Sequence, residues 1–460
     1  MNSLRNRHNE LNLGEIEMSI QSKTLSRRSF LYAGAFGAAA TLAPTSAANG
    51  ATESYPFTPN TGLVDAFVAR RGGAIGTGGK AAIAFRCDHH LNKFESRLLP
   101  LHQKYGIPVT IAAMSQMFRV ETGTNGSTNL SFPRLQALAL ANGLEIANHG
   151  ATHTDADTPQ RLREEIVYSR NALSAALPKL PLELFIPPGV GGTQYLGFAG
   201  GKTQYSFQRY LAGRLITQQH AMSTGYVPGY WPMTGNPLDS MGNVHVSIEN
   251  ADYARRGPDF IAAARKQGRG VCFMYHPSLV DDTDLQAIDG FFAWCARERD
   301  ADRLEILTTT GLMMANFSTS SRHDVMSAGT SFVLGWNGWN GAAANWARRT
   351  DSGVTYARRG SQSLALFKDV PVGAYAGSAR QLRVSMRSTT GVRVKVEVFD
   401  PANQASFSAA KTITLSPAAG FQQAHQYVIL PLTGTPRVRV RITPLSGGEL
   451  HVQEPRLLAA

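Results

Sequence analysis

The stretch His149-Gly150-Ala151-Thr152-His153 sets two imidazoles four residues apart, so that both can reach one metal ion from a single turn. Two other polar clusters, Asp88-His89-His90 and Met274-Tyr275-His276, have the same kind of position in the chain. Each cluster directly follows an apolar run that is typical of a buried strand, namely Ala81–Phe85, Leu144–Ala147 and Val271–Met274. Ligands and catalytic groups gather at the carboxyl ends of strands in α/β folds, so the three clusters predict one shared site on such a fold.

The sequence around these clusters alternates short apolar runs with amphipathic stretches from about Thr61 to Phe317, which predicts a parallel α/β domain. The number of units favours a distorted barrel of about seven or eight βα units, although an open sheet fits the same pattern. Helices are predicted over Phe94–Tyr105, Pro133–Ala141, Thr158–Ala176, Pro258–Lys266 and Leu285–Arg299, and further strands over Pro108–Ala113, Leu182–Ile186 and Leu304–Leu307.

A different texture begins after residues 318–329, whose Ser, Thr and Gly content predicts a linker. From 330 to 460 the sequence consists of short alternating runs separated by Gly, Pro and Asn, which predicts an all-β jelly roll or sandwich. The runs are Ser363–Phe367, Gln381–Met386, Val392–Phe399, Lys411–Leu415, Gln426–Leu430 and Arg437–Ile442. Three tryptophans, Trp336, Trp339 and Trp346, either stack on sugar rings or pack the core of this sandwich.

Charge is concentrated in this second part. The chain has a formal net charge of +12, and from Asn337 onward it has 15 Lys and Arg against 6 Asp and Glu. A positive module favours an anionic glycan or a cell surface as partner. Nucleic acid is a poor alternative, because the sequence has no motif that reads bases.

The amino terminus predicts export. A twin-arginine motif, Ser26-Arg27-Arg28-Ser29-Phe30-Leu31, is followed by the apolar run Leu31–Leu42 and by small residues at Thr45-Ser46-Ala47. The run is shorter than the ~20 residues that span a bilayer, so we expect residues 1–47 to be a signal region. We expect no transmembrane segment in the mature chain, and a periplasmic or secreted location.

The α/β part resembles the polysaccharide deacetylases of the NodB-homology class, carbohydrate esterase family 4, over most of residues 80–317. The segment Arg86-Cys87-Asp88-His89-His90 corresponds to that family's first motif, Thr-Phe-Asp-Asp-Gly, and the stretch 149–153 corresponds to its His-x-x-x-His motif. Phe185-Ile186-Pro187-Pro188-Gly189 resembles the third motif, and His276 corresponds to the histidine of the fifth. The resemblance implies a hydrolase of amide bonds that removes acetyl groups from a polysaccharide, an N-acetylhexosamine-containing glycan above all.

The same resemblance implies the site residues. Asp88 falls on the catalytic base, and His276 is a suitable acid for the leaving amine. The ligands of one divalent metal are His89, His149 and His153, and three imidazoles favour zinc. In the alternative register, Asp88 itself is the ligand beside His149 and His153.

The third motif departs from the family pattern, since it lacks the arginine that normally orients the base. This departure keeps a second hypothesis open, that of a weak or inactive deacetylase fold that binds glycans. Pro188 and Gly189 are predicted to contact the substrate, and Gly189 lies where a backbone N–H would stabilise the oxyanion. Tyr230 and Trp231 either form a sugar platform or close the core of the barrel.

Three further interpretations complete this set. A glycoside hydrolase on a similar barrel would need a pair of carboxylates at strand ends, and only Asp88 is clearly placed. His276 is alternatively a buried histidine bonded to backbone. His90 is expected to support the site without binding the metal, and His102 is expected on a solvated helix face.

Overall fold

The computed structural model describes residues 60–116, 130–326 and most of the chain from 332 to 460. In the last stretch the described residues are 332, 336, 338–340, 346–351, 354–359, 364–404, 406–408, 410–432 and 436–460. The predicted signal region, 1–47, and the end of the predicted linker, 327–329, lie outside the described residues. Within the described ranges, no helix is both long and apolar enough to cross a membrane.

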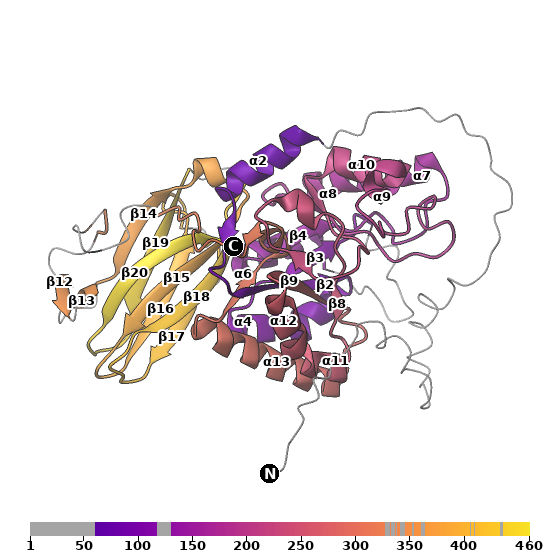
Figure 1. The fold of residues 1–460 in the computed structure, drawn as a ribbon. Coiled ribbons are helices and arrows are strands. Elements are labelled where there is room, and N and C mark those ends of the chain that lie inside the picture. The colour runs from indigo at the N-terminus through magenta and orange to yellow at the C-terminus, as the bar shows by residue number, and fades with distance from the viewer. Residues whose placement is uncertain are drawn as a thin grey trace, which may run out of the picture. The chain divides into compact units, whose positions relative to one another are not determined.

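The first part of the chain folds around a sheet with β2 (Ala81–Asp88) at its centre (Figure 1). The main strand order is β6-β5-β4-β3-β2-β9-β7, with β10 also pairing with β2 and β8 with β9. All these pairings are parallel except that of β7 with β9. This half-barrel confirms the predicted α/β fold. The bounds are β3 Thr110–Ala113, β4 Glu145–Asn148, β5 Leu184–Phe185, β6 Met222–Ser223, β7 Trp231–Pro232, β8 Val246–Ser247, β9 Arg269–Tyr275 and β10 Leu304–Leu307.

The central strand β2 is buried along its whole length, because both faces of the sheet are covered. The two-residue period of the strand divides its side chains between two cores. Ile83, Phe85 and Cys87 pack into one core with the long helix α13 (Asp282–Asp300), whereas Ala82 and Ala84 pack into the other. Burial on both faces explains why β2 is a continuous apolar run in the sequence.

The helices lie close to their predicted ranges. Thr158, the first residue of its predicted helix, caps that helix by accepting a hydrogen bond from Arg161 N, as its sequence position suggested. The predicted helices are α3–η1–α4 (Leu91–Lys93, Phe94–Leu98, Leu99–Tyr105), α6 (Phe132–Asn142), α7–η2–α8 (Pro159–Arg163, Glu164–Tyr168, Ser169–Ala176), α12 (Gly257–Lys266) and α13. The sequence interpretation did not include α2 (Thr61–Arg71), α9 (Ser206–Arg209), α10 (Leu211–Gln219), α11 (Ala251–Arg255) and α14 (Thr309–Met313).

His102 on α4 is not solvated as predicted. Its side chain is buried, with Nδ1 3.0 Å from Ile107 O and Nε2 2.5 Å from the hydroxyl oxygen of Tyr275. Burial lowers the pKa of His102 to about 3, although the bond to Ile107 acts in the opposite direction. The helix therefore turns this imidazole toward the strand end of β9.

The second part of the chain is an antiparallel sandwich, as predicted. A five-stranded sheet has the order β12-β13-β20-β15-β18, and a four-stranded sheet the order β14-β19-β16-β17. Alternate residues of β16, from Val392 to Val398, are buried in the core between the sheets. The bounds are β12 Trp346–Asp351, β13 Val354–Arg359, β14 Leu366–Pro371, β15 Ala379–Arg387, β16 Val392–Phe399, β17 Lys411–Leu415, β18 Gln422–Ile429, β19 Arg437–Pro444 and β20 His451–Ala459.

Of the two interpretations of the tryptophans, core packing describes this sandwich. Trp339 and Trp346 are buried in its core, and Trp346 Nε1 donates to Leu364 O. Trp336 is partly buried and packs against the same core. Trp339 and Trp346 therefore offer no open ring face of the kind that stacks on a sugar.

The sandwich shares buried contacts with the α/β part, and residues 57–460 form one compact unit. Tyr427 and Ile429 of β18 join the core around β2, and the Tyr427 hydroxyl donates to Ile306 O at 2.5 Å. Gly143, just before β4, has φ +65°, and a Cβ there would lie 2.4 Å from the Tyr427 carbonyl. Glycine at this position allows the backbone of β18 to approach the sheet directly.

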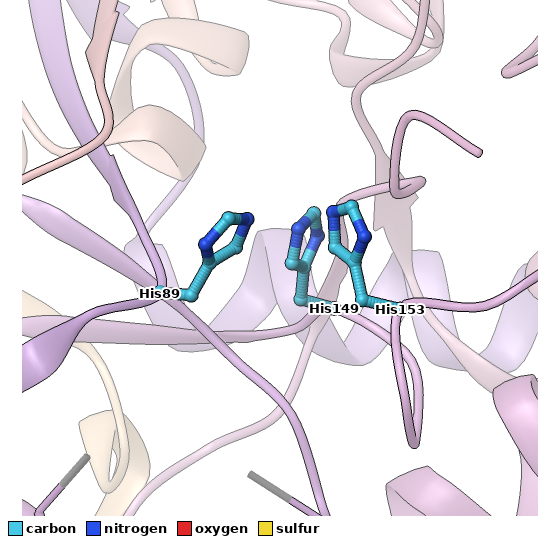
Figure 2. Close-up of side chains that lie close together, drawn as sticks. All are labelled: His89, His149 and His153. Atoms are coloured by element: carbon cyan, nitrogen blue, oxygen red, sulfur yellow. The ribbon is translucent and has the colours of Figure 1, made fainter. Parts of the chain in front are cut away.

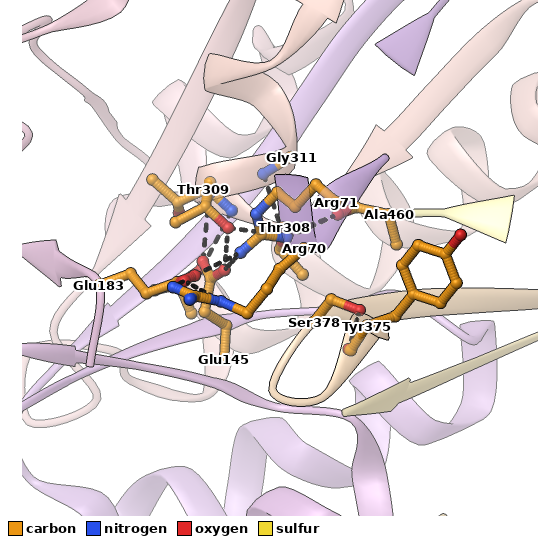
Figure 3. A network of polar contacts seen from close by, with 12 residues as sticks. Arg70, Arg71, Glu145, Glu183, Thr308, Thr309, Gly311, Tyr375, Ser378 and Ala460 are labelled. Atoms are coloured by element: carbon orange, nitrogen blue, oxygen red, sulfur yellow. Dashed lines mark hydrogen bonds and ion pairs between the residues drawn. The ribbon is translucent and has the colours of Figure 1, made fainter. Parts of the chain in front are cut away.

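A buried polar network joins α2 to the amino end of β4 (Figure 3). Arg71 Nη2 lies 3.3 Å from both Glu145 Oε1 and Glu183 Oε2, and Arg70 also pairs with Glu183. The other Glu145 oxygen accepts hydrogen bonds from Thr110 Oγ1 and Thr310 N. Each buried charge thus has a partner, as burial requires.

A second buried network crosses from β10 to the sandwich and predicts a stability effect. Glu305, which is 2% exposed, lies 2.6 Å from Lys80 Nζ, 3.0 Å from Arg322 Nη1 and 3.5 Å from Arg383 Nη2. We expect Glu305→Gln to lower the free energy of unfolding by about 3–5 kcal/mol, because it removes the counter-charge of Arg322, which is almost fully buried, and of Arg383. Urea denaturation followed by circular dichroism measures this loss.

The control is Glu298→Gln, which removes the partner of Arg303 on the surface of α13. We expect this change to cost less than about 1 kcal/mol. Equal losses in the two variants would show that Glu305 does not connect the two parts of the protein.

Candidate metal and catalytic site

His89, His149 and His153 come together at the carboxyl ends of β2 and β4. One ring nitrogen from each lies within 4.8 Å of those from the other two. Figure 2 shows the three rings projecting in the same direction, two from the loop after β4 and one from the end of β2. The ring centroids of His89 lie 5.5 Å from His149 and 4.8 Å from His153. The histidines predicted as ligands are therefore placed as one group that can hold a divalent ion.

The loop after β4, which contains His149 and His153, is held by Glu165 on η2. One oxygen of this buried carboxylate accepts hydrogen bonds from Ala151 N at 2.7 Å and Thr152 N at 3.1 Å. His153 itself has φ +58°, a left-handed conformation that costs energy for a residue other than glycine. The bonds to Glu165 hold the loop in that conformation, so Glu165 positions His153.

His149 has the chemistry of a metal ligand. Its Nδ1 donates to Ile186 O at 2.8 Å, which orients the ring and fixes the tautomer. Its Nε2 is buried and has no hydrogen-bond partner among the described residues. Burial lowers the pKa of His149 to about 3, despite the nearby Asp88 carboxylate, so the ring is neutral at pH 7. An orphaned lone pair on a buried neutral imidazole fits a bound divalent ion.

The other two imidazoles are kept neutral in the same way. Burial and the neighbouring His149 hold the pKa of His89 well below its ordinary value. Burial also lowers the pKa of His153. Because only the neutral ring can donate a lone pair to a metal, all three side chains are ready to bind at neutral pH.

Asp88 is held by a bidentate ion pair with Arg86, the residue two positions earlier on β2. Arg86 Nε donates to Asp88 Oδ1 at 2.8 Å and Arg86 Nη2 donates to Oδ2 at 2.6 Å. Both side chains are buried. Although burial opposes ionisation, Arg86 and the imidazoles of His149 and His276 hold the pKa of Asp88 far below its usual range. Asp88 is a carboxylate at every pH near neutral.

This ion pair supplies what the third motif lacks. The third motif, near Ile186, has no arginine to orient the base. In this structure the guanidinium that contacts Asp88 belongs to Arg86 on β2. Residues i and i+2 of a strand lie on the same face, so Arg86 reaches Asp88 without any loop. The sequence contains this signal, an arginine two residues before the predicted base.

The geometry also bears on which residue, His89 or Asp88, is the metal ligand beside His149 and His153. Both oxygens of Asp88 face the guanidinium of Arg86, whereas His89 lies with His149 and His153 in the group of possible metal ligands. The arrangement favours His89 as the ligand and Asp88 as its neighbour.

His276 lies at the same site and is oriented by Glu249. Its ring centroid lies 5.0 Å from that of His89. His276 Nδ1 is 2.7 Å from Glu249 Oε2, and the same oxygen accepts the backbone N–H of His276 at 2.8 Å. Burial lowers the pKa of His276, but the bond to Glu249 outweighs it, so the pKa is raised above its ordinary value. Glu249, two residues after the short strand β8, was not singled out from the sequence.

The two predicted substrate contacts on the loop after β5 differ in exposure. Pro188 is buried and has no backbone N–H, whereas Gly189 is exposed on the loop after β5. A Cβ at Gly189 would lie 3.1 Å from the hydroxyl oxygen of Tyr226, so this hydroxyl lies over the loop. Tyr226, which the sequence interpretation did not include, interacts electrostatically with Arg86 and Asp88.

Tyr230 and Trp231 lie elsewhere. Trp231 is 1% exposed, donates from Nε1 to Val244 O, and pairs with Gly270 at the amino end of β9. His276 follows the opposite end of that strand, six residues on, or about 20 Å away. The structure corrects the prediction of a sugar platform here: Trp231 belongs to one core of the sheet, and Tyr230, directly before it, packs partly buried against the other core.

A comparison with protein families identifies the domain that contains this site. Residues 76–206 match the family model described as polysaccharide deacetylase. The matched range includes Arg86, Asp88 and the three clustered histidines, so the chain has a polysaccharide deacetylase domain, and the resemblance stated from the sequence is confirmed. No curated protein matches the chain.

Some of the similar solved structures match the α/β part of this chain, and one matches the sandwich. A family 4 carbohydrate esterase from Streptomyces lividans in complex with acetate is 16% identical and covers 53% of this chain and 96% of its own, with a TM-score of 0.28. A CE4 family pseudoenzyme from Bacillus anthracis is 14% identical, with 51% and 66% covered and a TM-score of 0.29. A CBM4 structure matches the C-terminal part at 11% identity, with 26% and 81% covered and a TM-score of 0.21.

The three-histidine group predicts stoichiometric binding of one divalent metal. We expect His149→Ala to lose tight binding, because two remaining imidazoles make an incomplete ligand set. Metal analysis by mass spectrometry after dialysis measures the occupancy. The control is His323→Ala, a histidine near the sandwich, which should leave one ion per chain. Full occupancy in His149→Ala would contradict the assignment.

Proposed function

We propose, on the premise that residues 76–206 form a polysaccharide deacetylase domain, that this protein is a metal-dependent enzyme that removes acetyl groups from a glycan. The observation that carries the proposal is the meeting of three neutral imidazoles with an arginine-held carboxylate at the carboxyl ends of one sheet. The family acts on amide bonds, so the proposed substrate is a polysaccharide that contains N-acetylhexosamine. The twin-arginine motif at Arg27 and Arg28 supports export, which fractionation of producing cells would test.

His89, His149 and His153 would hold the metal. A divalent ion bound by them would lower the pKa of water and polarise the acetyl carbonyl. Three imidazole ligands suit zinc among the common divalent ions, so zinc is the proposed metal. Metal analysis of the protein purified without added metal tests this choice.

Asp88 is the proposed base. Its carboxylate stays ionised beside the imidazoles and can take a proton from the water that attacks the acetyl group. The fork of Arg86 holds both carboxylate oxygens, so the carboxylate cannot rotate away from the water. A carboxylate fixed in this way loses little orientational entropy when the transition state forms.

His276 is the proposed acid. The departing amine must be protonated, and Glu249 keeps a proton on the imidazole by raising the pKa of His276. Because Glu249 binds Nδ1, the other ring nitrogen, Nε2, is the one that can face the substrate. The Tyr226 hydroxyl, close to Gly189, is placed to donate to the oxyanion where Pro188 cannot.

The competing hypothesis is a deacetylase fold that binds glycans without cleaving them. Its main support was the missing arginine of the third motif, and the Arg86–Asp88 pair removes that support. Acetate release from a panel of acetylated oligosaccharides separates the two hypotheses. Binding without any release by metal-loaded protein would favour the glycan-binding protein.

The base and its arginine make a paired prediction. We expect Asp88→Asn to keep the metal and to lower kcat about 10²–10⁴-fold, the usual worth of general acid–base catalysis. Arg86→Lys keeps the charge but loses the fork, and we expect kcat to fall about 10–10²-fold through misplacement of the carboxylate. Acetate release and metal content are measured on the same samples. Wild-type kcat in Asp88→Asn would reject Asp88 as the base.

The acid and its carboxylate make a second pair. His276→Gln should lower kcat about 10²–10⁴-fold and leave glycan binding largely unchanged. Glu249→Gln should lower kcat less, about 10-fold, because the ring keeps its place but loses the charged partner of its Nδ1. Glu298→Gln, on the surface of α13, is the matched control and should not change kcat. Equal kcat in Glu249→Gln and the control would show that Glu249 has no positioning role.

A further inference from the structure

A cavity of about 200 Å³ lies at the opposite end of the sheet from the metal-binding histidines. Its walls come from the ends of α4 and α13 in the α/β part and from β17 and β18 in the sandwich. Tyr105 on α4 precedes β3, and Asp300 on α13 precedes β10, so both lie at amino ends of strands. The metal-binding histidines follow carboxyl ends, which makes the cavity separate from the proposed catalytic site.

Lysine and arginine side chains dominate the charge of this cavity. Lys104, Arg299 and Lys411 line it, and Asp300 is the acidic residue among the lining side chains. Asp300 Oδ1 already accepts from Arg299 Nε at 2.9 Å and lies 3.4 Å from His425 Nε2. The carboxylate of the cavity is therefore engaged by other residues.

Lys411 has no ion-pair partner among the described residues, since Asp300, the carboxylate that acts on it electrostatically, is paired with Arg299. Its Nζ donates to the backbone oxygen of His425 at 3.0 Å, and no carboxylate of the described residues lies within 4.0 Å of it. His425, on β18 of the other sheet, is 1% exposed and stays neutral, because burial lowers its pKa to about 3. Burial also lowers the pKa of Lys411 to about 8, which leaves the ammonium largely protonated at pH 7.

A partly buried ammonium without an ion-pair partner is costly, and an anion beside it would relieve that cost. Arg299 cannot be the main contact, since its Nη1 donates to the backbone oxygens of Tyr105 and Gly106. The remaining lining groups suit a hydroxylated ligand: Gln423 can donate to and accept from hydroxyls, Asp300 can accept from them, and Tyr105 lies at the wall. The volume is below the 300–1,000 Å³ that is typical for drug-sized ligands, so it admits about one sugar ring.

We propose that this cavity binds a carboxylate-bearing sugar residue of an acidic glycan, with Lys411 Nζ on the carboxylate. The choice of a sugar acid over another carboxylate rests on the proposed function, whereas the anion site rests on the cavity itself. A glycan held here, at the far end of the sheet, keeps the enzyme on its polymer without filling the catalytic site.

The test uses the full chain and isothermal titration calorimetry at low salt. The probes are a trimer of glucuronate, the same trimer with its carboxyl groups reduced to alcohols, and sodium sulfate. We expect the acidic trimer to bind and the reduced trimer to bind at least 10-fold more weakly. We expect Lys411→Met, which keeps the length of the side chain, to weaken binding of the acidic trimer at least 10-fold.

The matched control is Lys395→Met on β16 of the same sandwich, a lysine that pairs with Glu397 and does not line the cavity. This variant should bind the acidic trimer within 2-fold of the wild type. Lys104→Met, at the exposed rim, should weaken binding less than Lys411→Met and serves if the latter does not fold. Unchanged binding in both cavity variants, or equal loss in Lys395→Met, would overturn the site.

The same titrations distinguish a sugar carboxylate from a simple inorganic anion as the ligand. Sulfate that binds as tightly as the acidic trimer would overturn the assignment to a sugar. Acetate release from a short neutral acetylated oligosaccharide is measured in parallel and should be the same in Lys411→Met and the wild type. Absence of release by the wild type would reject the deacetylase and leave the calorimetric result intact.

Discussion

The Arg86–Asp88 ion pair is the interaction on which the whole site depends. A carboxylate buried beside three imidazoles would be protonated or displaced unless a cation held it, and the bidentate fork of Arg86 does so from two residues away on the same strand. The pair keeps Asp88 charged and fixed, and it leaves His89 to join His149 and His153. The division of labour between carboxylate and imidazoles therefore follows from one strand and its two-residue period.

The fold could be predicted where a pattern reports burial directly. Strands β2 and β9 are buried on both faces and contain long apolar runs, and most sandwich strands alternate. Strand β12 has exposed arginines and no alternation, so it carries no such signal. Strand β20 contains Pro455, which argues against a central strand, yet β20 lies between β13 and β15. A register shift opposite this proline, between Arg383 and Ser385, accommodates it, and no local pattern shows such a bulge.

The site was predictable to the extent that its residues follow strand ends in the sequence. His89, His149, His153, Asp88 and His276 all do so, and the structure brings them together. The residues that position them were missed for different reasons. Glu165 acts from the middle of a helix and Glu249 from beyond a two-residue strand, so only the tertiary fold brings them to the histidines. Trp231 was misplaced because an aromatic residue in a Gly- and Pro-rich stretch looks alike at either end of a barrel.

Much of the positive charge of the sandwich is used in contacts within the fold, which the sequence alone does not show. Arg380 donates to Arg70 O, Arg383 and Arg322 meet Glu305, and Arg439 and Arg441 pair with Asp369 and Glu397. These arginines act within the fold, several of them where the sandwich meets the α/β part, so the formal charge overstates the exposed cationic surface. Attraction of an acidic glycan by net charge alone is correspondingly weak and screened by salt. A partly buried lysine without an ion-pair partner is a more selective attractor, because its gain depends on an anion that fits the cavity.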